Sequence, residues 1–436
     1  MEKSIGIQHK TIKEKVKREY IRRVRAVLKT ELTAKNKITA IGALAVPVLQ
    51  YGFAILNWKM KEIKALDIKT RKCMTMHKMH HPSADVDRLY VSRKLGGRGL
   101  RQIESTYKSS IINAKYYLQE KKKEDPFLKA VYAVNLTLDK DHITKEANKF
   151  EAELGENFEV APINSRKQKI KKKISESIRT KWKGKIMHGQ YPLMLENDSI
   201  ESNLSTIWLS KGVLKAETES LIVAAQDQAL NTRYRERKIH KKHVNSKCRI
   251  CHQFEETIEH ITSGCPILAQ KDYIERHDRV CTQLHYSLCK EYGIEVDADK
   301  WYEHKPKNTA TTRDGETTIL WNFPIRTDRT VEANRPDIIL RRKGQTCLLI
   351  DVSIPADRNI TKKEAEKKLK YKDLEIEISR MWKTKTRVIP FVIGATGAVS
   401  KDWTKLKNEI PGKHSLVLAQ KSAVLGTARI LRKVLS

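Results

Sequence analysis

Four side chains of the types that bind zinc lie within eighteen residues of this chain. Cys248 and Cys251 form a C-x-x-C pair, and His260 and Cys265 follow at an H-x-x-x-x-C spacing. The first spacing lets two thiolates face one ion from a tight turn, and the second can bring two further ligands from a short helix. Three thiolates and one imidazole complete a tetrahedral Zn²⁺ site with no position left for a substrate. The pattern therefore predicts a structural zinc knuckle with His252 as a bystander, and a chance cluster of thiols is the alternative.

A second group of residues has the chemistry of a Mg²⁺ site. Asp337 opens one predicted strand, and Asp351 ends the hydrophobic run CLLID fourteen residues later. A hairpin of two such strands would bring both carboxylates to one rim, where their oxygens could share Mg²⁺. Phosphodiester hydrolysis needs such a site to activate water and to stabilise the pentavalent state. Lys367 and Lys370 lie at i and i+3 on the following predicted helix, with Glu364 on the same face, and either lysine could approach the rim.

This second pattern leaves two interpretations open. Many nucleases place a lysine two residues after the second acid, whereas Ser353 occupies that position here. The alternative is an ordinary β-hairpin with two exposed aspartates beside a solvated helix of lysines. The spacing alone does not separate the two interpretations.

The charge of the chain favours a polyanionic partner. The 436 residues include 86 Lys and Arg against 52 Asp and Glu, a net charge of +34 that is spread along the chain. Such a field attracts phosphate backbones, with anionic membrane and acidic protein as competing partners. Seven cysteines in a chain of this length do not make a disulfide framework, and their clustering with histidine fits a reducing compartment. The N-terminal segment is charged from its second residue, so we expect no secretory signal.

Basic amphipathic segments locate the expected contacts with nucleic acid. Residues 8–35 and 165–185 show apolar positions at helical spacing with lysine and arginine on the other faces, and a third basic run at 233–247 leads into the cysteine cluster. For any single lysine, the solvated face of a docked helix is an equally good interpretation. The residues predicted to bind nucleic acid are Arg22, Arg23, Lys171, Lys172, Lys173, Lys181, Arg233, Arg235, Arg237, Lys241 and Lys242.

One uncharged segment, residues 38–58, is long enough to resemble a membrane span. It contains Pro47, Gln50 and Asn57, and it lies between strongly basic segments. We therefore predict a buried core helix broken near Pro47, and we expect no membrane partner.

The order of the elements predicts the fold class. Short β-rich runs at 317–323, 337–342, 347–354 and 387–394, with a helical pattern at 359–382, are typical of a small α/β domain. The N-terminal two-thirds of the chain are predicted to be mainly α. The predicted division is a helical domain at 1–125, a basic helical linker at 126–240, the zinc-knuckle region at 241–290 and the α/β domain at 291–436.

From about residue 15 to 415 the chain resembles the C-terminal half of the reverse-transcriptase protein of non-LTR retrotransposons, the site-specific LINE type with a restriction-like endonuclease. The segments that carry the resemblance keep the order of that family and include the CCHC knuckle. The others are YIRRVRAVLKTEL, AIGALAVPVLQYG, LDIKTRKCMTMHKMHHPSADVDRLYVSRKLGGRGL, RPDIILRR, LLIDVSIP and EKKLKYKDL.

The resemblance implies a role for each part of the chain. Residues 1–125 would correspond to a reverse-transcriptase thumb, 126–240 to a linker, and 291–436 to a PD-(D/E)xK restriction-endonuclease-like domain. The implied activity is that of a Mg²⁺-dependent DNA endonuclease, which nicks target DNA so that its 3′ end primes reverse transcription. The implied partners are target DNA and retroelement RNA, and the implied location is the nucleus.

The resemblance also implies which residues act in the endonuclease domain. Asp337 and Asp351 correspond to the Mg²⁺-binding acids of the family. The K-x-x-K-Y motif falls on Lys367, Lys370 and Tyr371, and it leaves open which of the two lysines is the catalytic one.

Polymerase chemistry is not expected of this chain. It needs paired aspartates, usually in a Tyr-x-Asp-Asp turn, to hold two Mg²⁺ ions, and the sequence contains no Asp-Asp pair. We therefore expect a piece of a longer protein whose polymerase palm and fingers are missing here. Two other functions stay open: a catalytically inactive DNA- or RNA-binding module, and a domesticated remnant that uses the knuckle for protein contact.

Overall fold

The computed structural model of this chain describes residues 8–137, 143–158, 163–412 and 414–435. The chain forms two compact units, which are residues 1–190 with 213–220 and residues 191–212 with 221–436. Each unit has its own hydrophobic core. The four-segment division expected from the sequence is finer than these two units and stays a prediction.

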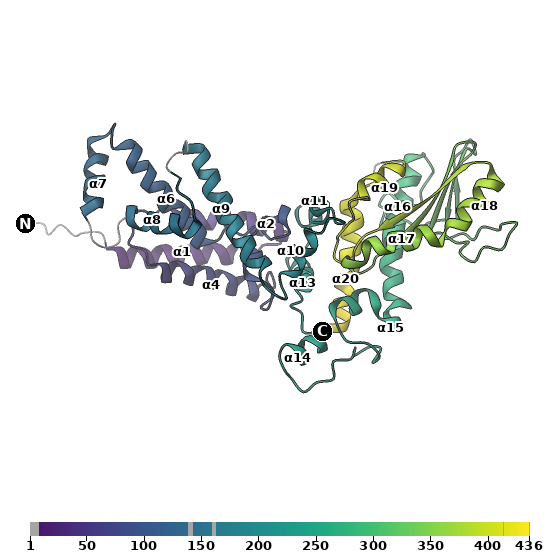
Figure 1. The fold of residues 1–436 in the computed structure, drawn as a ribbon, viewed down its shortest axis with the longest axis horizontal. Helices are drawn as coiled ribbons and strands as arrows, with labels where there is room; N and C mark the ends of the chain where they lie inside the picture. The colour runs from purple at the N-terminus through teal and green to yellow at the C-terminus, as the bar shows by residue number, and fades with distance from the viewer. Residues whose placement is uncertain (1–7, 138–142, 159–162, 413, 436) are drawn as a thin grey trace, which may run out of the picture. The chain divides into compact units, whose positions relative to one another are not determined.

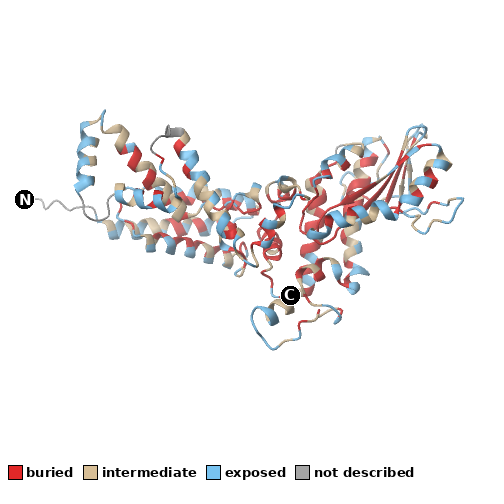
Figure 2. Cartoon of the chain, viewed as in Figure 1, coloured by how far each residue is buried: buried red, intermediate tan, exposed pale blue. Residues whose placement is uncertain are grey.

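The first unit is built from helices (Figure 1). In α1 (His9–Lys29) and α4 (Met60–Met76), buried apolar residues recur every three or four positions, so one face of each helix enters the core. Figure 2 shows the resulting alternation of buried and exposed residues along the helices. The other elements of this unit are α2 (Ala34–Ala40), η1 (Ile41–Ala45), α3 (Val46–Gln50), α5 (Val86–Tyr90), η2 (Arg93–Leu95), α6 (Ile103–Lys121), α7 (Pro126–Thr137), α8 (Ile143–Leu154) and α9 (Ile163–Lys183).

The uncharged segment around Pro47 stays helical from α2 to α3, with a π-helical turn, η1, in its middle. Proline lacks a backbone N–H and its ring crowds the carbonyl four residues earlier, so a regular α-helix cannot pass through it undisturbed. The Val46 N–H bonds to the carbonyl of Ile41, five residues back, which widens the helix just before the proline. The disturbance near Pro47 therefore takes the form of a widened turn and not of a break. Among the described residues, no helix is long and apolar enough to cross a membrane.

The second unit contains a five-stranded mixed sheet in the order β1-β2-β3-β4-β5. The first four strands are antiparallel neighbours, and β4 pairs with β5 in parallel. The strands are β1 (Thr309–Thr311), β2 (Thr317–Trp321), β3 (Ile338–Arg342), β4 (Thr346–Ser353) and β5 (Lys385–Val392).

Helices cover both faces of this sheet (Figure 1). Ile338 and Ile350 pack with residues of α16 (Asp272–Glu291) and α20 (Leu416–Leu435) on one face. Ile339 and Leu349, which alternate with them, pack on the other face against Tyr371 and α18 (Lys372–Trp382). The remaining helical elements of the chain are α10 (Gln190–Leu195), α11 (Ser202–Ser205), α12 (Ile207–Lys211), α13 (Ala216–Gln226), α14 (Arg233–Lys238), η3 (His260–Gly264), α15 (Pro266–Ala269), η4 (Asp357–Asn359), α17 (Ile360–Lys370) and α19 (Trp403–Glu409).

The fold class expected from the sequence is confirmed at the coarse level. The chain is mostly helical and has a small mixed sheet near its C-terminus, and each of the four predicted β-runs overlaps an observed strand. The helical pattern at 359–382 is observed as two helices, α17 and α18, which are separated by a turn at Tyr371. The short strand β1 was not among the predicted runs.

A buried arginine ties α16 to its surroundings. Arg276 donates to the carbonyl of Thr262 (2.8 Å), to the hydroxyl of Thr427 (2.9 Å) and to the carbonyl of Ile354 (3.2 Å). Burial lowers its pKa to about 10, and the guanidinium stays charged at neutral pH. One side chain thus joins the π-helical turn between His260 and Cys265, the C-terminal helix α20 and the residue that follows β4.

Gly426 in α20 makes room for this arginine. A Cβ atom at Gly426 would lie 2.5 Å from Cγ of Arg276. In Gly426→Ala, overpacking should cost about 1–3 kcal/mol against a gain of about 1 kcal/mol from helix propensity, so the protein is expected to lose up to about 2 kcal/mol of stability. Gly42→Ala is the control, because its nearest neighbour would lie at 4.0 Å. The midpoint of denaturant unfolding should fall for the first variant only, and equal midpoints would contradict the tight packing.

Candidate metal centres

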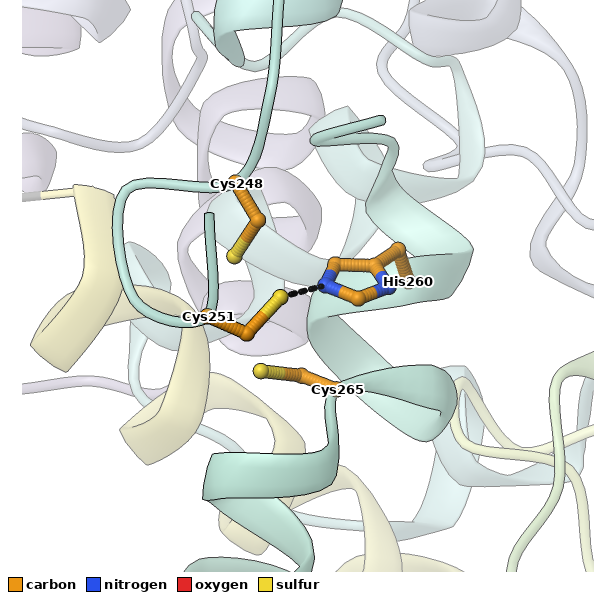
Figure 3. A group of neighbouring side chains, drawn as sticks. All are labelled: Cys248, Cys251, His260 and Cys265. Atoms are coloured by element: carbon orange, nitrogen blue, oxygen red, sulfur yellow. Dashed lines mark hydrogen bonds between the residues drawn. The ribbon is translucent and has the colours of Figure 1, made fainter. Parts of the chain in front are cut away.

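The four predicted zinc ligands come together in the second unit. One ligand atom from each of Cys248, Cys251, His260 and Cys265 lies within 4.8 Å of the others, and all four residues are buried. Figure 3 shows the three sulfurs and the imidazole converging on one point, and Cys251 Sγ lies 3.3 Å from His260 Nε2. This donor set fits a closed tetrahedral zinc site.

A tight turn positions the first two cysteines. The Cys248 N–H donates to the carbonyl of Phe254 (2.7 Å), and the His252 N–H donates to the carbonyl of Cys248 (2.9 Å). His252 adopts a left-handed conformation with φ of 57° and is exposed. It belongs to the turn and not to the ligand group, as the sequence predicted.

The other two ligands are held by a tyrosine of α16. The Cys265 N–H donates to the Tyr273 hydroxyl (3.1 Å), and that hydroxyl lies 2.8 Å from the carbonyl of Ile261, to which it donates. His260 begins the π-helical turn η3, and its N–H donates to Thr257 Oγ1 (3.1 Å). The predicted short helix between His260 and Cys265 is therefore a π-helical turn, anchored from α16.

A fully buried carboxylate fastens the basic segment before the knuckle to the cysteine turn. Glu256 accepts the N–H of Arg233 (2.8 Å), the N–H of Arg249 (2.8 Å) and two bonds from the guanidinium of Arg249. Burial opposes ionisation, but these donors hold the pKa of Glu256 below its usual value. The backbone of Arg233 thus helps to hold the knuckle, whichever contact its side chain makes with nucleic acid.

The protonation states of the ligands suit a metal site. Burial lowers the pKa of His260, so the imidazole is neutral and can ligate a metal. Burial raises the pKa of Cys265 to about 11, so its thiol keeps the proton at neutral pH. A metal cation beside the sulfur would stabilise the thiolate form that ligation needs.

The comparison with protein families decides what this centre is. Residues 186–271 match the family described as zinc-binding in reverse transcriptase, and the match includes all four ligands. This segment is a reverse-transcriptase-type zinc-binding domain. The predicted Zn²⁺ is thereby confirmed, and the domain relates the chain to retroelement proteins. No curated protein matches the sequence.

The two predicted acids lie at the same end of neighbouring strands. The register pairs Ile338 of β3 with Ile350 of β4, and its continuation by one residue sets Asp337 beside Asp351. The side chain of Asp351 is 3% exposed and forms an ion pair with Lys367, whereas that of Asp337 is 22% exposed. The structure therefore brings Asp337, Asp351 and Lys367 together in the second unit.

Asp337, Asp351 and Lys367 are here called the rim. Tyr371 and Lys370 lie against it. Tyr371 is buried, and its hydroxyl donates to the carbonyl of Arg335 (3.2 Å), two residues before Asp337. Burial raises the pKa of Tyr371, and the carboxylates of Asp351 and Asp337 raise it further, so the hydroxyl keeps its proton. Lys370 donates to that hydroxyl (3.1 Å), so all five residues predicted as catalytic meet at one place.

Glu364 does not take part in this rim. It is buried on α17, and Ser400 donates to it at 2.6 Å. Burial raises its pKa. Glu364 was expected to assist the rim, but the packing of α17 directs its carboxylate to Ser400.

The sequence reasoning missed two neighbours of Asp337. His277 of α16 places Nε2 3.1 Å from Asp337 Oδ2, which also accepts the N–H of Val352 (2.7 Å). Cys281 lies one helical turn further, with Sγ 3.6 Å from His277 Nε2. The signal was present, because α16 carries two consecutive H-x-x-x-C pairs, at 277–281 and 285–289.

The first unit contains a basic groove between α1 and α4, here called the α1–α4 groove. Its volume is about 1040 Å³, and Arg22, one of the predicted nucleic-acid contacts, lines it while its guanidinium also pairs with Glu19. Arg18, Arg25 and Lys29 extend the same stripe of α1 at helical spacing, a set that the sequence reasoning did not single out. Of the described residues, only two acidic ones, Glu14 and Glu62, line the groove. The basic residues that line it are Lys17, Arg18, Arg22, Arg25, Lys29, Lys59, Lys61 and Lys69.

The other predicted nucleic-acid contacts fall into two groups, those that already bond to another residue in the part of the chain that the structure describes and those that do not. Some are engaged within the protein: Arg23 with Glu19 and the carbonyl of Leu44, Lys172 with Glu176, Lys173 with Glu156, Arg235 with Asn231, and Lys242 with Glu236. Those that are exposed and have no acidic partner among the described residues are Lys171, Lys181, Arg237 and Lys241. This second group is the better placed for phosphate.

Proposed function

We propose that this chain is the nucleic-acid-binding and endonuclease part of a non-LTR retrotransposon protein, a Mg²⁺-dependent DNA endonuclease that nicks target DNA in the nucleus for target-primed reverse transcription. One observation carries the proposal. Residues from β4 and α17, from the position just before β3 and from the turn after α17 lie up to 34 positions apart in the sequence, from Asp337 to Tyr371, and meet at a single rim.

The residues at the rim fit Mg²⁺. Asp337 and Asp351 offer carboxylate oxygens, the ligands that this ion prefers, and they would hold it. The burial of Asp351 supports this assignment, because a buried carboxylate needs a cation beside it, and the Lys367 ammonium already contacts it. When bound, Mg²⁺ would supply charge neutralisation and an activated water.

The chain's own residues would position the reaction. Attack of water on phosphorus breaks the bond to O3′, which leaves the 3′ hydroxyl that priming needs and a 5′ phosphate. Lys367 contacts Asp351 directly and its side chain is 20% exposed, so it can also face a phosphate oxygen. Lys370 donates to Tyr371 instead. We therefore propose Lys367 as the catalytic lysine and Tyr371 as a positioning residue for the strand that carries Asp337.

The test is nicking of supercoiled plasmid by the whole chain. Relaxed circles should form with Mg²⁺ and should not form with a chelator present. Failure to nick any plasmid or target duplex under conditions where the protein is folded and zinc-loaded would contradict the proposal.

A non-catalytic binding module is the second candidate. Ser353 favours it, because it stands where many nucleases carry their lysine. This candidate predicts salt-dependent binding of nucleic acid with no nicking at all.

Binding to nucleic acid is expected to use the α1–α4 groove. The affinity for duplex DNA should fall with salt, with a slope of about 0.9 per phosphate contact in log K against log salt. Arg22→Ala with Arg25→Ala should reduce that slope by roughly 2 units, because two counterion-releasing contacts are removed. Lys385→Ala with Lys405→Ala is the control, since both lysines are exposed and lie outside the groove. A slope that falls equally in both variants would show that the groove is not the interface.

A further inference from the structure

A second group of metal-ligand side chains lies beside the predicted Mg²⁺ rim. His277, Cys281 and Asp337 each place one ligand atom within 4.8 Å of the other two. The first two residues are on α16, and the third precedes β3. None of them belongs to the zinc knuckle, and only Asp337 belongs to the rim.

The spacing of these atoms is that of a tetrahedral site. With bonds of about 2.0–2.1 Å to nitrogen or oxygen and about 2.3 Å to sulfur, the nitrogen and sulfur ligands of zinc stand roughly 3.6 Å apart, and nitrogen and oxygen roughly 3.3 Å apart. His277 Nε2 lies 3.6 Å from Cys281 Sγ and 3.1 Å from Asp337 Oδ2. Cys281 Sγ also lies 3.7 Å from Nδ1 of the same ring, so it faces the ring, and the imidazole must rotate to point the lone pair of Nε2 at an ion between the three atoms.

The surroundings of His277 favour coordination through Nε2. Its other ring nitrogen, Nδ1, lies 3.1 Å from a carboxylate oxygen of Asp278. Asp337 lies equally close to Nε2, and although burial opposes protonation, Cys281, Asp278 and Asp337 raise the pKa of His277. A cation at Nε2 must therefore displace the proton there, while Asp278 keeps the proton on Nδ1, as in carboxylate–histidine–zinc arrangements. The side chains of His277 and Asp337 are 28% and 22% exposed, so an ion can enter from solvent.

We infer that His277, Cys281 and Asp337 bind one Zn²⁺ ion in a site separate from the knuckle, with a fourth coordination position open. A thiolate and an imidazole select zinc over Mg²⁺. Asp337 cannot coordinate Zn²⁺ and Mg²⁺ fully at the same time. A Zn²⁺ ion bound in this site would therefore remove the Asp337 carboxylate from the Mg²⁺ site at the rim. The second part of the inference rests on the proposed endonuclease function, and the first part does not.

The same helix supplies an internal control. His285 and Cys289 repeat the i, i+4 pair, with Sγ 3.6 Å from Nδ1. His285 faces His304 at 2.9 Å, and no carboxylate completes a ligand group with this pair among the described residues. Both cysteines are buried on α16, so Cys281→Ser and Cys289→Ser are closely matched substitutions.

The test of the site is a titration of the whole chain, with its knuckle already loaded with zinc, by Co²⁺. We expect one further equivalent to bind, with the sulfur-to-cobalt charge-transfer band of a single thiolate. Cys281→Ser and His277→Gln should lose this equivalent, and Cys289→Ser should keep it. A chain that binds no further equivalent, or a band that persists in Cys281→Ser, would overturn the site. Zinc content and circular dichroism verify that each variant keeps the knuckle and the fold.

The effect of this zinc site on the Mg²⁺ rim, here called the linkage, is tested in the nicking assay with saturating Mg²⁺. Added Zn²⁺ should cause a loss of nicking, and the ratio of rates with and without Zn²⁺ should return toward one in Cys281→Ser but not in Cys289→Ser. Equal inhibition of both variants would overturn the linkage. If the wild-type chain does not nick at all, the proposed function fails, and the cobalt titration still decides whether the metal site exists.

Discussion

Asp351→Asn is expected to reduce Mg²⁺-dependent plasmid nicking by on the order of 10²–10³-fold or more, the scale on which removal of a charge-stabilising group acts in an active site. The substitution keeps the shape of the side chain but removes its negative charge. It therefore removes the proposed Mg²⁺ ligand and also the partner of Lys367. The measurement is the rate of conversion of supercoiled to nicked plasmid at saturating Mg²⁺.

Asp373→Asn is the matched control for this experiment. Asp373 lies two residues after Tyr371 and is exposed, so its substitution makes the same chemical change close to the site without touching the rim. It should leave the nicking rate within about twofold of the unsubstituted protein, as surface changes away from a site usually do. Nicking that survives Asp351→Asn undiminished would show that the rim is not where DNA is cut.

Cys251→Ser is expected to release one zinc equivalent per chain and to unfold the knuckle. Structural zinc contributes an apparent free energy of about 10–16 kcal/mol in small zinc-dependent domains, so loss of one thiolate removes most of the stability of the segment. The effect should spread to α16, because Tyr273 and Arg276 connect the knuckle to that helix and to the end of β4. Zinc content by metal analysis and the melting temperature by circular dichroism are the measurements.

Cys73→Ser is the control for the zinc experiment. Cys73 is also buried, but it lies on α4 of the first unit and belongs to no ligand group among the described residues. Its substitution should leave the zinc content unchanged. A Cys251→Ser protein that retains the full zinc content would contradict the assignment of this residue as a ligand.

The zinc knuckle was predictable because its information is local. All four ligands lie between Cys248 and Cys265, and their spacings by themselves restrict the turn and the helix that can join them. The strands were predictable for a similar reason, since each is a short run of hydrophobic residues that must be buried as a unit. The sequence could not show that His260 starts a π-helical turn, because this depends on the hydroxyls of Thr257 and Tyr273.

The rim was predictable only in part. The identities of Asp337, Asp351 and Lys367 followed from the pattern and from the family resemblance, whereas their meeting depends on the β3–β4 register and on how α17 packs against the sheet. Glu364 illustrates the difference. It shares a helix face with Lys367, but the packing of α17 directs it to Ser400.

Charge and ligand spacing are properties of neighbouring residues, so they were enough to predict a basic, mostly helical protein with a zinc knuckle. The groups that surround Asp337 could be identified only from the packing of the folded chain. His277 lies sixty residues before it and contacts it only because α16 packs against the sheet that β3 enters. Contacts of this kind arise from the packing of distant elements, which no local spacing encodes.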